Sequence, residues 1–336
     1  MAGVFRVMNW NILHSLESSR VQKFHYCRPE ALQTYHRVAS ILRQVNLQQP
    51  DIVCFQELDQ QLVNQIEAGI SAQLSRAHVS LNQTLPSKDG CGVYYNSQRF
   101  SLCETSVIRF RNLVDKHFQT LTEFAARDQS MFSLARALDR EIREKVNMAV
   151  FTRLNDKVTG KSVVAASAHL FWNPQFPDLK LLQAYVLAKE VLEFASTSDA
   201  IIIGADLNSV PNSSGVYELL MGNGSVATSH PDHPVTLRSK LGTNLGSVVS
   251  PEVVPELSLE VPFRSALRTL NGREPRFTNY TATFKGCLDY ILLGGEIKPI
   301  SAVPLPDEGD LQVEIALPNA QWPSDHLPLI VDLEFS

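Results

Sequence analysis

IIIGADLNS, at residues 201–209, is the stretch from which the fold and the function of this chain are predicted. Its apolar residues are typical of a buried strand that ends where the polar residues begin. Side chains two residues apart in an extended chain point the same way, so Asp206 and Asn208 are expected to face one spot. There a carboxylate can bind a divalent cation or take a proton, and an amide can donate to a phosphoryl oxygen. Taken alone, the same residues also fit an Asx turn that caps the next helix.

The size, charge and cysteine usage of the chain argue against several classes of protein. Its 336 residues are enough for one large domain or two ordinary ones. A net charge of −5 disfavours a sequence-independent duplex binder with a broad basic face, but it allows a nucleic-acid enzyme in which metal ions neutralise phosphate. No apolar run approaches the roughly 18–20 residues of a membrane span, and no targeting segment precedes the first predicted strand. The five cysteines lack C-x-x-C spacing, so we expect reduced thiols, no zinc site, and an intracellular, cytoplasmic protein.

Strand-like and helix-like segments alternate along the whole chain. Strands are predicted at residues 4–12, 51–57, 91–95, 100–108, 147–154, 162–170, 201–205, 287–293, 309–316 and 327–335. Helices are predicted at residues 28–45, 59–74, 178–194 and 213–220. Many strands interleaved with helices predict one α/β domain over residues 1–336 with a β-rich core. Residues 111–145, which read as helical, are expected to embellish this domain, and residues 222–260 to form a long surface loop or an insertion.

Polar and ionisable residues recur where the predicted apolar strands stop. They are Asn11, Glu57, His169, Asp206, Asn208, Asp289, Asp325 and His326. If the strands bring these ends together, four carboxylates share one site, and they cannot all be ionised there unless cations offset them. Carboxylate oxygens select hard ions such as Mg²⁺ or Mn²⁺, and no cysteine lies among these positions to favour zinc. Each residue alone is more simply a cap, a turn or a satisfied core group, but their joint recurrence predicts a metal-dependent site.

Six segments occur in a characteristic order between about residue 4 and residue 335. They are FRVMNWNIL, DIVCFQELD, SAHLFWNP, IIIGADLNSVP, TFKGCLDYILL and WPSDHLPL. In this order they resemble the endonuclease/exonuclease/phosphatase superfamily, which has the DNase I-like fold, an α/β four-layer sandwich (α/β/β/α) with two packed mixed β-sheets. The segments HLFWNPQFPDLKLLQ, PNSSGVYELL and RFTNYTATFKGCLDYI resemble its deadenylase branch, which includes the nuclease subunit of the Ccr–Not complex and the 2′-5′ phosphodiesterase. The chain lacks the leucine-rich repeats that precede the nuclease in the Ccr–Not enzyme, so docking through such repeats is not expected.

The resemblance also implies a role for each polar residue of this set. The implied metal ligands are Glu57, Asn11, Asp206 and Asp325. The implied catalytic residues are Glu57, His169, Asp206, Asn208, Asp289 and His326. In this scheme Asp289 holds the tautomer of His326, and Asn208 orients the nucleophile or the phosphate. Two Mg²⁺ or Mn²⁺ ions would stabilise the attacking and leaving oxygens of an in-line displacement.

A base-binding site is implied next to these residues. The implied substrate-binding residues are Pro174, Phe284, Asn208 and Asn279. Of these, Pro174 and Phe284 match the family's adenine clamp, and single-stranded RNA exposes the faces of its bases for such stacking. The alternative for Phe284 is packing in the core. Trp172 is expected to support its loop from the core, and Lys180 is expected to be a solvated charge.

Residues and resemblance together predict a Mg²⁺-dependent 3′-5′ exoribonuclease, a deadenylase that removes AMP from the poly(A) tails of single-stranded RNA. A 2′-5′ oligoadenylate phosphodiesterase is one alternative, and a nocturnin-like phosphatase of a small phosphorylated nucleotide is another. The intact WNP and FKG segments, at residues 172–174 and 284–286, favour a polynucleotide substrate. A catalytically dead binding module on the same scaffold is disfavoured, because every expected site position is filled.

Overall fold

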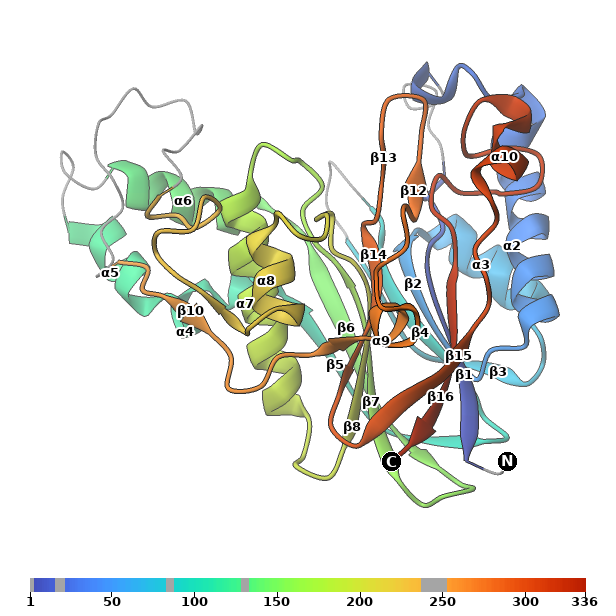
Figure 1. Cartoon of the computed structure of the whole chain (residues 1–336), viewed down its shortest axis with the longest axis horizontal. Coiled ribbons are helices and arrows are strands. Elements are labelled where there is room, and N and C mark those ends of the chain that lie inside the picture. The colour runs from blue at the N-terminus through green and yellow to red at the C-terminus, as the bar shows by residue number, and fades with distance from the viewer. Residues whose placement is uncertain (1–2, 16–21, 83–87, 128–132, 237–252) are drawn as a thin grey trace.

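The computed structural model of the chain contains two mixed β-sheets that pack face to face (Figure 1). It describes residues 3–15, 22–82, 88–127, 133–236 and 253–336. The first sheet consists, in spatial order, of β15 (Ile297–Ala302), β16 (Leu329–Phe335), β1 (Val4–Asn11), β2 (Ile52–Leu58), β4 (Gly90–Asn96) and β3 (Leu74–Leu81). The second consists of β11 (Arg264–Ser265), β14 (Asp289–Gly294), β8 (Ala200–Asp206), β7 (Ser162–His169), β6 (Met148–Asp156) and β5 (Phe100–Arg109).

Helices cover the outer face of each sheet (Figure 1). Over the first sheet lie α2 (Thr34–Gln48) and α3 (Gln60–Gly69). Over the second lie α4 (Val114–His117), α5 (Gln119–Arg127), α6 (Ser133–Glu144), α7 (Pro177–Phe194) and α8 (Gly215–Met221). These four layers confirm the predicted α/β/β/α sandwich. Among the described residues, no helix is long and apolar enough to cross a membrane.

Smaller elements complete the chain. They are β9 (Ser225–Val226), β10 (Leu257–Ser258), α9 (Ala266–Asn271), β12 (Asn279–Tyr280), β13 (Lys285–Gly286) and α10 (Glu308–Leu311). Short 3₁₀ turns lie at Gln22–Phe24, Pro29–Leu32, Phe110–Asn112 and Gln312–Glu314. Strands β12 and β13 form a hairpin that projects beyond the sheets (Figure 1).

The two sheets come from different parts of the chain. The first sheet is built from residues 4–96 and 297–335, and the second from residues 100–294. Strands β1 and β2 are parallel, as are β7 and β8, whereas the other neighbours in the two sheets are antiparallel. Each sheet therefore has a parallel pair at its centre, flanked by antiparallel strands.

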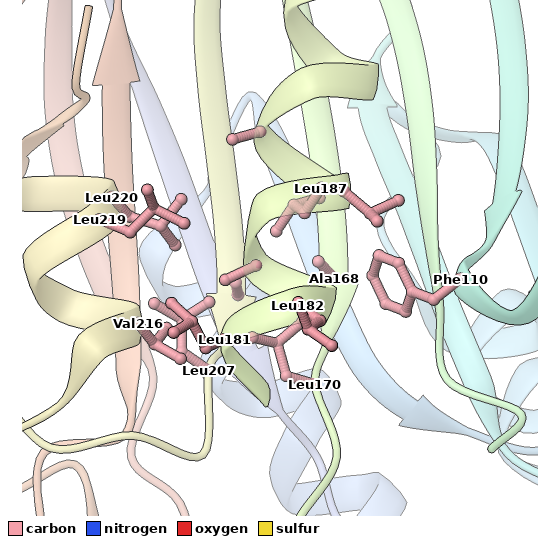
Figure 2. Close-up of a cluster of buried hydrophobic side chains, with 14 of the residues drawn as sticks. Phe110, Ala168, Leu170, Leu181, Leu182, Leu187, Leu207, Val216, Leu219 and Leu220 are labelled. Atoms are coloured by element: carbon pink, nitrogen blue, oxygen red, sulfur yellow. The ribbon is translucent and has the colours of Figure 1, made fainter. Parts of the chain in front are cut away.

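The apolar run of β8 is continuous because both faces of the strand are buried. Ile202 points into the core between the sheets, whereas Ile201 and Ile203 belong to the core under the helices. Figure 2 shows this outer core, to which α7 contributes Leu187 and α8 contributes Leu219. Burying one such leucine stabilises the fold by about 1.5–3 kcal/mol, so the helices hold β8 firmly in the middle of its sheet.

A polar network crosses the core between the sheets. Nε2 of Gln56 donates to Oδ1 of Asn9 (2.9 Å), to Oγ of Ser167 (3.0 Å) and to the carbonyl O of Gly204 (3.2 Å). Nδ2 of Asn9 in turn donates to the carbonyl O of Ala205 at 3.3 Å. Sliding one sheet over the other would leave these buried groups unpaired, which costs more than the net gain of each bond. The network therefore fixes the position of one sheet against the other.

Gly204 allows the two sheets to approach closely at this network. A Cβ atom on Gly204 would lie 2.7 Å from Cβ of Cys54 and 2.8 Å from Oδ1 of Asn9, which both belong to the first sheet. Both neighbours are fully buried, so neither can withdraw into solvent. The glycine of the GAD motif is thus required by packing between the sheets.

The Gly204→Ala variant should have a free energy of unfolding about 1–3 kcal/mol lower than the wild type, because added atoms in a packed core displace their neighbours. Urea denaturation of both proteins measures the difference. Gly309→Ala is the matched control, since an added Cβ on Gly309 in α10 meets nothing within 4 Å and this variant should keep its stability or gain slightly. Wild-type stability of Gly204→Ala would contradict the close approach.

Two predicted segments differ in the structure. The prediction of a strand at residues 309–316 is wrong, because α10 and a 3₁₀ turn occupy most of this segment. Glu308 and Asp310 favour the helix, since carboxylates in a first turn interact well with the helix dipole. The predicted helix at residues 59–74 ends at Gly69, and β3 follows it where no strand is predicted.

Residues 111–145 and 222–260 contribute to the outer core. Val114 and Ile142 are buried there from the first segment, and Val226, Val254 and Leu257 from the second. The described part of residues 222–260 therefore packs against the fold and is more than the surface loop that the sequence predicts as one alternative. Residues 237–252 of this segment lie outside the described residues.

Candidate active site

The predicted polar residues meet at one edge of the sandwich, where the parallel strands of both sheets end. Asn11 and Glu57 lie at the ends of β1 and β2 in the first sheet, and His169 and Asp206 end β7 and β8 in the second. In the ladder of the second sheet, Asp206 pairs with His169 on one side and with Asp289 on the other. Strand register alone thus places three of the predicted side chains in a row.

Asp289 and His326 reach this edge at the beginnings of strands rather than at their ends. Asp289 is the first residue of β14, and His326 precedes β16. Strands β14 and β16 run antiparallel to their neighbours β8 and β1, so they begin where those neighbours end. The prediction that these two residues follow apolar strands is wrong, yet the antiparallel direction brings them to the same edge.

An irregularity of β2 turns Glu57 into the site. Cys54 and Gln56 point between the sheets, so regular alternation would send the Glu57 side chain to the opposite face, under the helices. Instead, Glu57 has a φ of 58° and lies where the pairing of β2 with β4 shifts register. Asn208 is also left-handed, with a φ of 48°. Such backbone costs about 1–3 kcal/mol per residue and concentrates at sites where function requires an unusual side-chain direction.

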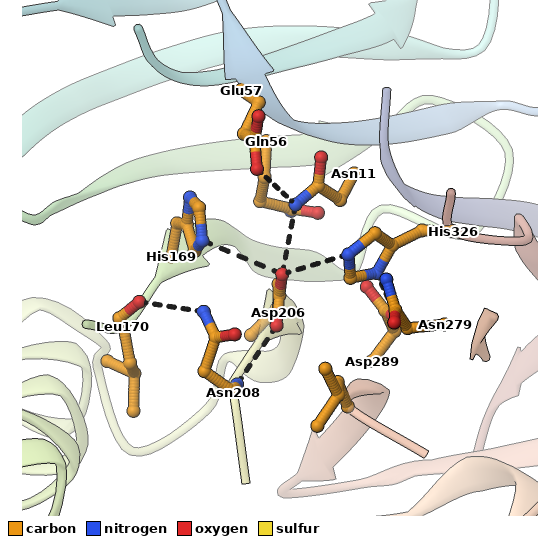
Figure 3. Close-up of polar contacts among 12 residues, drawn as sticks. Asn11, Gln56, Glu57, His169, Leu170, Asp206, Asn208, Asn279, Asp289 and His326 are labelled. Atoms are coloured by element: carbon orange, nitrogen blue, oxygen red, sulfur yellow. Dashed lines mark hydrogen bonds and ion pairs between the residues drawn. The ribbon is translucent and has the colours of Figure 1, made fainter. Parts of the chain in front are cut away.

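Asp206 is the centre of the site (Figure 3). Its Oδ2 accepts a hydrogen bond from Nδ2 of Asn11 at 2.9 Å, and it lies 3.6 Å from Nε2 of His169 and 3.7 Å from Nε2 of His326. Its Oδ1 accepts a hydrogen bond from the backbone N–H of Asn208 at 2.9 Å. A single buried carboxylate therefore gathers two imidazoles and an amide around one point.

Asn11 bridges the two sheets through its amide nitrogen. Nδ2 donates to Oε1 of Glu57 at 3.0 Å as well as to Asp206, while Oδ1 accepts a hydrogen bond from the backbone N–H of Leu13 at 3.0 Å. The structure thus turns the N–H groups of Asn11, and not its oxygen, toward the two carboxylates. In this geometry Asn11 orients Glu57 and Asp206.

Asp289 holds the imidazole of His326. Its Oδ2 lies 2.7 Å from Nδ1 of His326, and it also accepts a hydrogen bond from Oγ1 of Thr278 at 2.6 Å. Burial opposes a charge on His326, but the carboxylates of Asp289 and Asp206 raise its pKa well above the usual range. Thr278 escapes prediction because a lone threonine carries no signal in a sequence; its hydroxyl also accepts the backbone N–H of Asp289 at 3.0 Å.

Two further residues that the sequence does not reveal support Glu57. Nδ1 of His14 hydrogen-bonds with Oε2 of Glu57. Burial opposes ionisation of Glu57, but the hydrogen bond and the charge of His14 hold its pKa well below the usual range. Arg37 of α2 is fully buried and donates to the carbonyl O atoms of Ile12, His14 and Pro323, at 2.6, 3.1 and 2.7 Å. Burial lowers the pKa of Arg37 to about 10, so it remains a cation at neutral pH, close to the carboxylates.

Lys180 of α7 is buried, so the prediction of a solvated charge is wrong. Its Nζ donates to the carbonyl O of Asn208 at 2.6 Å, and burial lowers its pKa. On the other side, Nδ2 of Asn208 donates to the carbonyl O of Leu170 at 3.0 Å (Figure 3). Asn208 is therefore held by its backbone and by its side chain, which stabilises its left-handed conformation.

The site opens into a pocket of about 900 Å³. Its lining includes Glu57, His169, Asp206, Asn208, Asp325 and His326, together with Pro174, Asn279 and Phe284. Asn279 also donates through Nδ2 to Oδ2 of Asp325 at 3.4 Å. Phe284, in the β12–β13 hairpin, is 42% exposed and does not belong to the core. Trp172 is 64% exposed on the same pocket, so the expectation that it supports its loop from the core is wrong.

Comparison with known proteins agrees with this arrangement. The sequence profile of the Endonuclease/Exonuclease/phosphatase family matches residues 8–326. The chain belongs to this family. Membership confirms the resemblance and the DNase I-like fold that the motifs predict.

Similar proteins include a phosphodiesterase, an exoribonuclease subunit and a cyclic phosphatase. A 2′,5′-phosphodiesterase 12 from Bos taurus and a CCR4-Not complex 3′-5′-exoribonuclease subunit Ccr4 from Mycosarcoma maydis are each 27% identical to this chain, over 99% and 96% of its length. The chain spans about half the length of these relatives, 52% and 49%. The solved structure of ANGEL2, a 2′,3′-cyclic phosphatase in complex with adenosine-2′,3′-vanadate, shares the fold with a TM-score of 0.75 at 21% identity, covering 99% of this chain and 96% of that one.

Enzymes of the endonuclease/exonuclease/phosphatase family depend on divalent metal ions, and the residues of this site fit such an ion. Two groups of three residues have ligand atoms within 4.8 Å of one another. One group is His14, Glu57 and Asp89, and the other is Asp206, Asp289 and His326. Oδ1 atoms of Asp289 and Asp325 are buried without a hydrogen-bond partner among the described residues. Burial raises the pKa of Asp325, the charge of His326 opposes this, and the charge of Glu57 adds to it. A cation would satisfy these oxygens and relieve the repulsion between the carboxylates.

Proposed function

We propose that this chain is a Mg²⁺- or Mn²⁺-dependent 3′-5′ exoribonuclease that removes AMP from poly(A) in single-stranded RNA. The observation that carries the proposal is one pocket whose lining joins the hydrolytic groups, Asp206 and His326, to an exposed aromatic ring, Phe284. Phosphodiester hydrolysis needs the former, and recognition of an unpaired base needs the latter. The similarity to a 3′-5′-exoribonuclease subunit supports the same activity.

In the proposed reaction, the carboxylate of Asp206 takes a proton from the attacking water, and Asn11 keeps that carboxylate in place. His326 carries a proton because Asp289 holds its Nδ1, so its Nε2–H donates to a phosphate oxygen. His169 donates to the phosphate from the opposite side of Asp206. Asn208, fixed at backbone and side chain, orients the water or the phosphate.

The proposed metal ligands are Glu57, Asp206 and Asp325. A divalent cation bound there would offset the charge of the phosphate and of the attacking and leaving oxygens. Asn11, predicted as a ligand, orients Glu57 and Asp206 in this geometry and would coordinate only through its oxygen. In the same proposal the terminal adenine stacks between Pro174 and Phe284, and Asn279 contacts it by hydrogen bonding.

A 2′-5′ oligoadenylate phosphodiesterase is the second candidate. The observation in its favour is the identity of 27% to 2′,5′-phosphodiesterase 12, the same as to the exoribonuclease subunit. Both activities would use the same hydrolytic groups and the same clamp for adenine, and they differ in whether the pocket admits a 3′-5′ or a 2′-5′ phosphodiester linkage. An assay that compares substrates with these two linkages therefore separates the candidates.

With Mg²⁺, the protein should shorten a 5′-labelled A₂₀ RNA one nucleotide at a time and release AMP. The rate should exceed that on U₂₀ by about 10-fold, because hydrogen bonding by Asn279 adds to the modest advantage of the larger adenine face in stacking. Gel ladders and chromatography of the products measure both results. Preferential hydrolysis of 2′-5′ tetra-adenylate would support the second candidate, and release of inorganic phosphate without AMP would contradict both.

A further inference from the structure

Trp172 is an exposed indole on the wall of the active-site pocket. It lies in the loop between His169 at the end of β7 and helix α7, and it is 64% exposed. Among the described residues, Trp172 and Phe284 are the exposed large hydrophobic side chains that line this pocket, and the others lie elsewhere on the surface. An indole offers a large apolar face, so its exposure beside a substrate pocket points to a ligand that covers it.

The indole is supported at its base by a small aromatic group. Phe171 lies 6.1 Å from Trp172 between ring centroids, and Phe171 meets Phe176 edge to face at 5.7 Å. These contacts fix the loop without covering Trp172. The ring therefore presents a firm surface to the pocket, which a flexible exposed side chain would not.

Positive charge accompanies the aromatic group. Nζ of Lys23 lies 5.9 Å from the ring centroid of Trp172, and Nζ of Lys145 lies 5.0 Å from that of Phe171. Both lysines line the pocket, although Lys145 also pairs with Glu141 at 2.8 Å. The net charge of the chain is −5, so these lysines are a local feature of the pocket. Aromatic platforms next to cations are the usual means of binding single-stranded nucleic acid.

The size of the pocket allows more than one nucleotide. Its volume of about 900 Å³ lies near the upper end of the roughly 300–1,000 Å³ that accommodate one drug-sized ligand. Trp172 lines the same pocket as Pro174 and Phe284, so one strand can reach both the clamp and the indole.

We propose that Trp172 stacks on a second base of the substrate, a base upstream of the terminal one. The inference rests on the proposed function, and it makes the substrate a single-stranded oligonucleotide in which at least two bases are bound. A stacked base strengthens binding, so kcat/KM should be higher for tetra-adenylate than for the same tetranucleotide with an abasic residue next to its 3′-terminal adenosine. The ratio of kcat/KM for these two substrates isolates the contribution of the second base.

In the Trp172→Ala variant this ratio should fall by about 10-fold, the loss expected for one stacked base. Trp172→Phe should restore most of the ratio, because it keeps an aromatic face. Tyr35→Ala is the matched control, since Tyr35 is 69% exposed but lies outside the pocket and its loss should leave the ratio unchanged. A wild-type ratio in Trp172→Ala would overturn the proposal.

Fluorescence gives a second readout that does not need hydrolysis. Trp10 is fully buried and Trp322 lies outside the pocket, so quenching by tetra-adenylate in EDTA reports stacking on Trp172. If neither oligonucleotide is cleaved, the proposed activity is refuted, but quenching still shows whether a base stacks on Trp172. The stacking proposal would be overturned if saturating tetra-adenylate binds, as shown by fluorescence anisotropy of a labelled oligonucleotide, without quenching the fluorescence.

Discussion

The Asp206→Asn variant should lose about 10³- to 10⁴-fold in kcat while remaining folded. The substitution keeps the volume of the side chain but removes the charge that faces His169 and His326 at 3.6 and 3.7 Å. It also turns one acceptor of the side chain into a donor, so Asn11 or Asn208 loses its partner. Steady-state hydrolysis of A₂₀, together with thermal melting, measures both effects.

The melting temperature separates this interpretation from simple damage to the fold. Without metal, Asp206→Asn should melt close to the wild type, because the lost hydrogen bond and the relief of repulsion between carboxylates act in opposite directions. Asp332→Asn is the matched control. The Asp332 carboxylate on β16 accepts hydrogen bonds from Arg6 on β1 and Ser301 on β15, away from the site, so the variant should keep its activity and melt lower. An Asp206→Asn enzyme with more than a tenth of wild-type kcat would refute the role of Asp206.

Chelation should abolish hydrolysis and destabilise the protein at the same time. The buried, unpartnered oxygens of Asp289 and Asp325 and the cluster around Glu57 repel one another when no cation offsets them. Because a ligand that binds only the folded state stabilises it by mass action, a divalent ion at 100 times its Kd should add about 2.7 kcal/mol. Thermal melting and hydrolysis should therefore recover together as Mg²⁺ or Mn²⁺ is returned.

Matched ionic strength controls for screening. K⁺ at the same ionic strength as the Mg²⁺ buffer should restore neither hydrolysis nor the melting temperature, since general screening acts weakly on buried charges. Asp206→Asn should show a smaller metal-dependent rise in melting temperature than the wild type. Full activity in excess EDTA would refute the metal-dependent mechanism.

The sequence predicts the edge at which the site forms because apolar strands and polar residues next to them are local signals. Apolar runs in the sequence predict the strand ends at Asn11, His169 and Asp206, and the order of the strands in the two sheets brings these ends together. The direction of the Glu57 side chain has no such signal. It depends on a register shift between β2 and β4, and pairing between segments far apart in the chain is not visible in either segment alone.

Burial is the second property that the sequence does not supply. A lysine is solvated by default, yet Lys180 is buried because the carbonyl O of Asn208 accepts its hydrogen bond. A tryptophan is usually buried, yet Trp172 is exposed on the pocket. Both exceptions lie at the site, where functional requirements override the average preferences of residue types.

The origin of the two sheets determines when the enzyme becomes competent during its own synthesis. Hydrogen bonds at the site join Asn11 to Asp206 and His326 to Asp289, so each contact crosses from one sheet to the other. Strand β16 lies between β1 and β15 in the first sheet, and it is synthesised later than the other strands of the two sheets, shortly after Asp325 and His326. A nascent chain that ends at residue 324 therefore lacks both residues and also the strand that pairs with β1 and β15, so its site is incomplete.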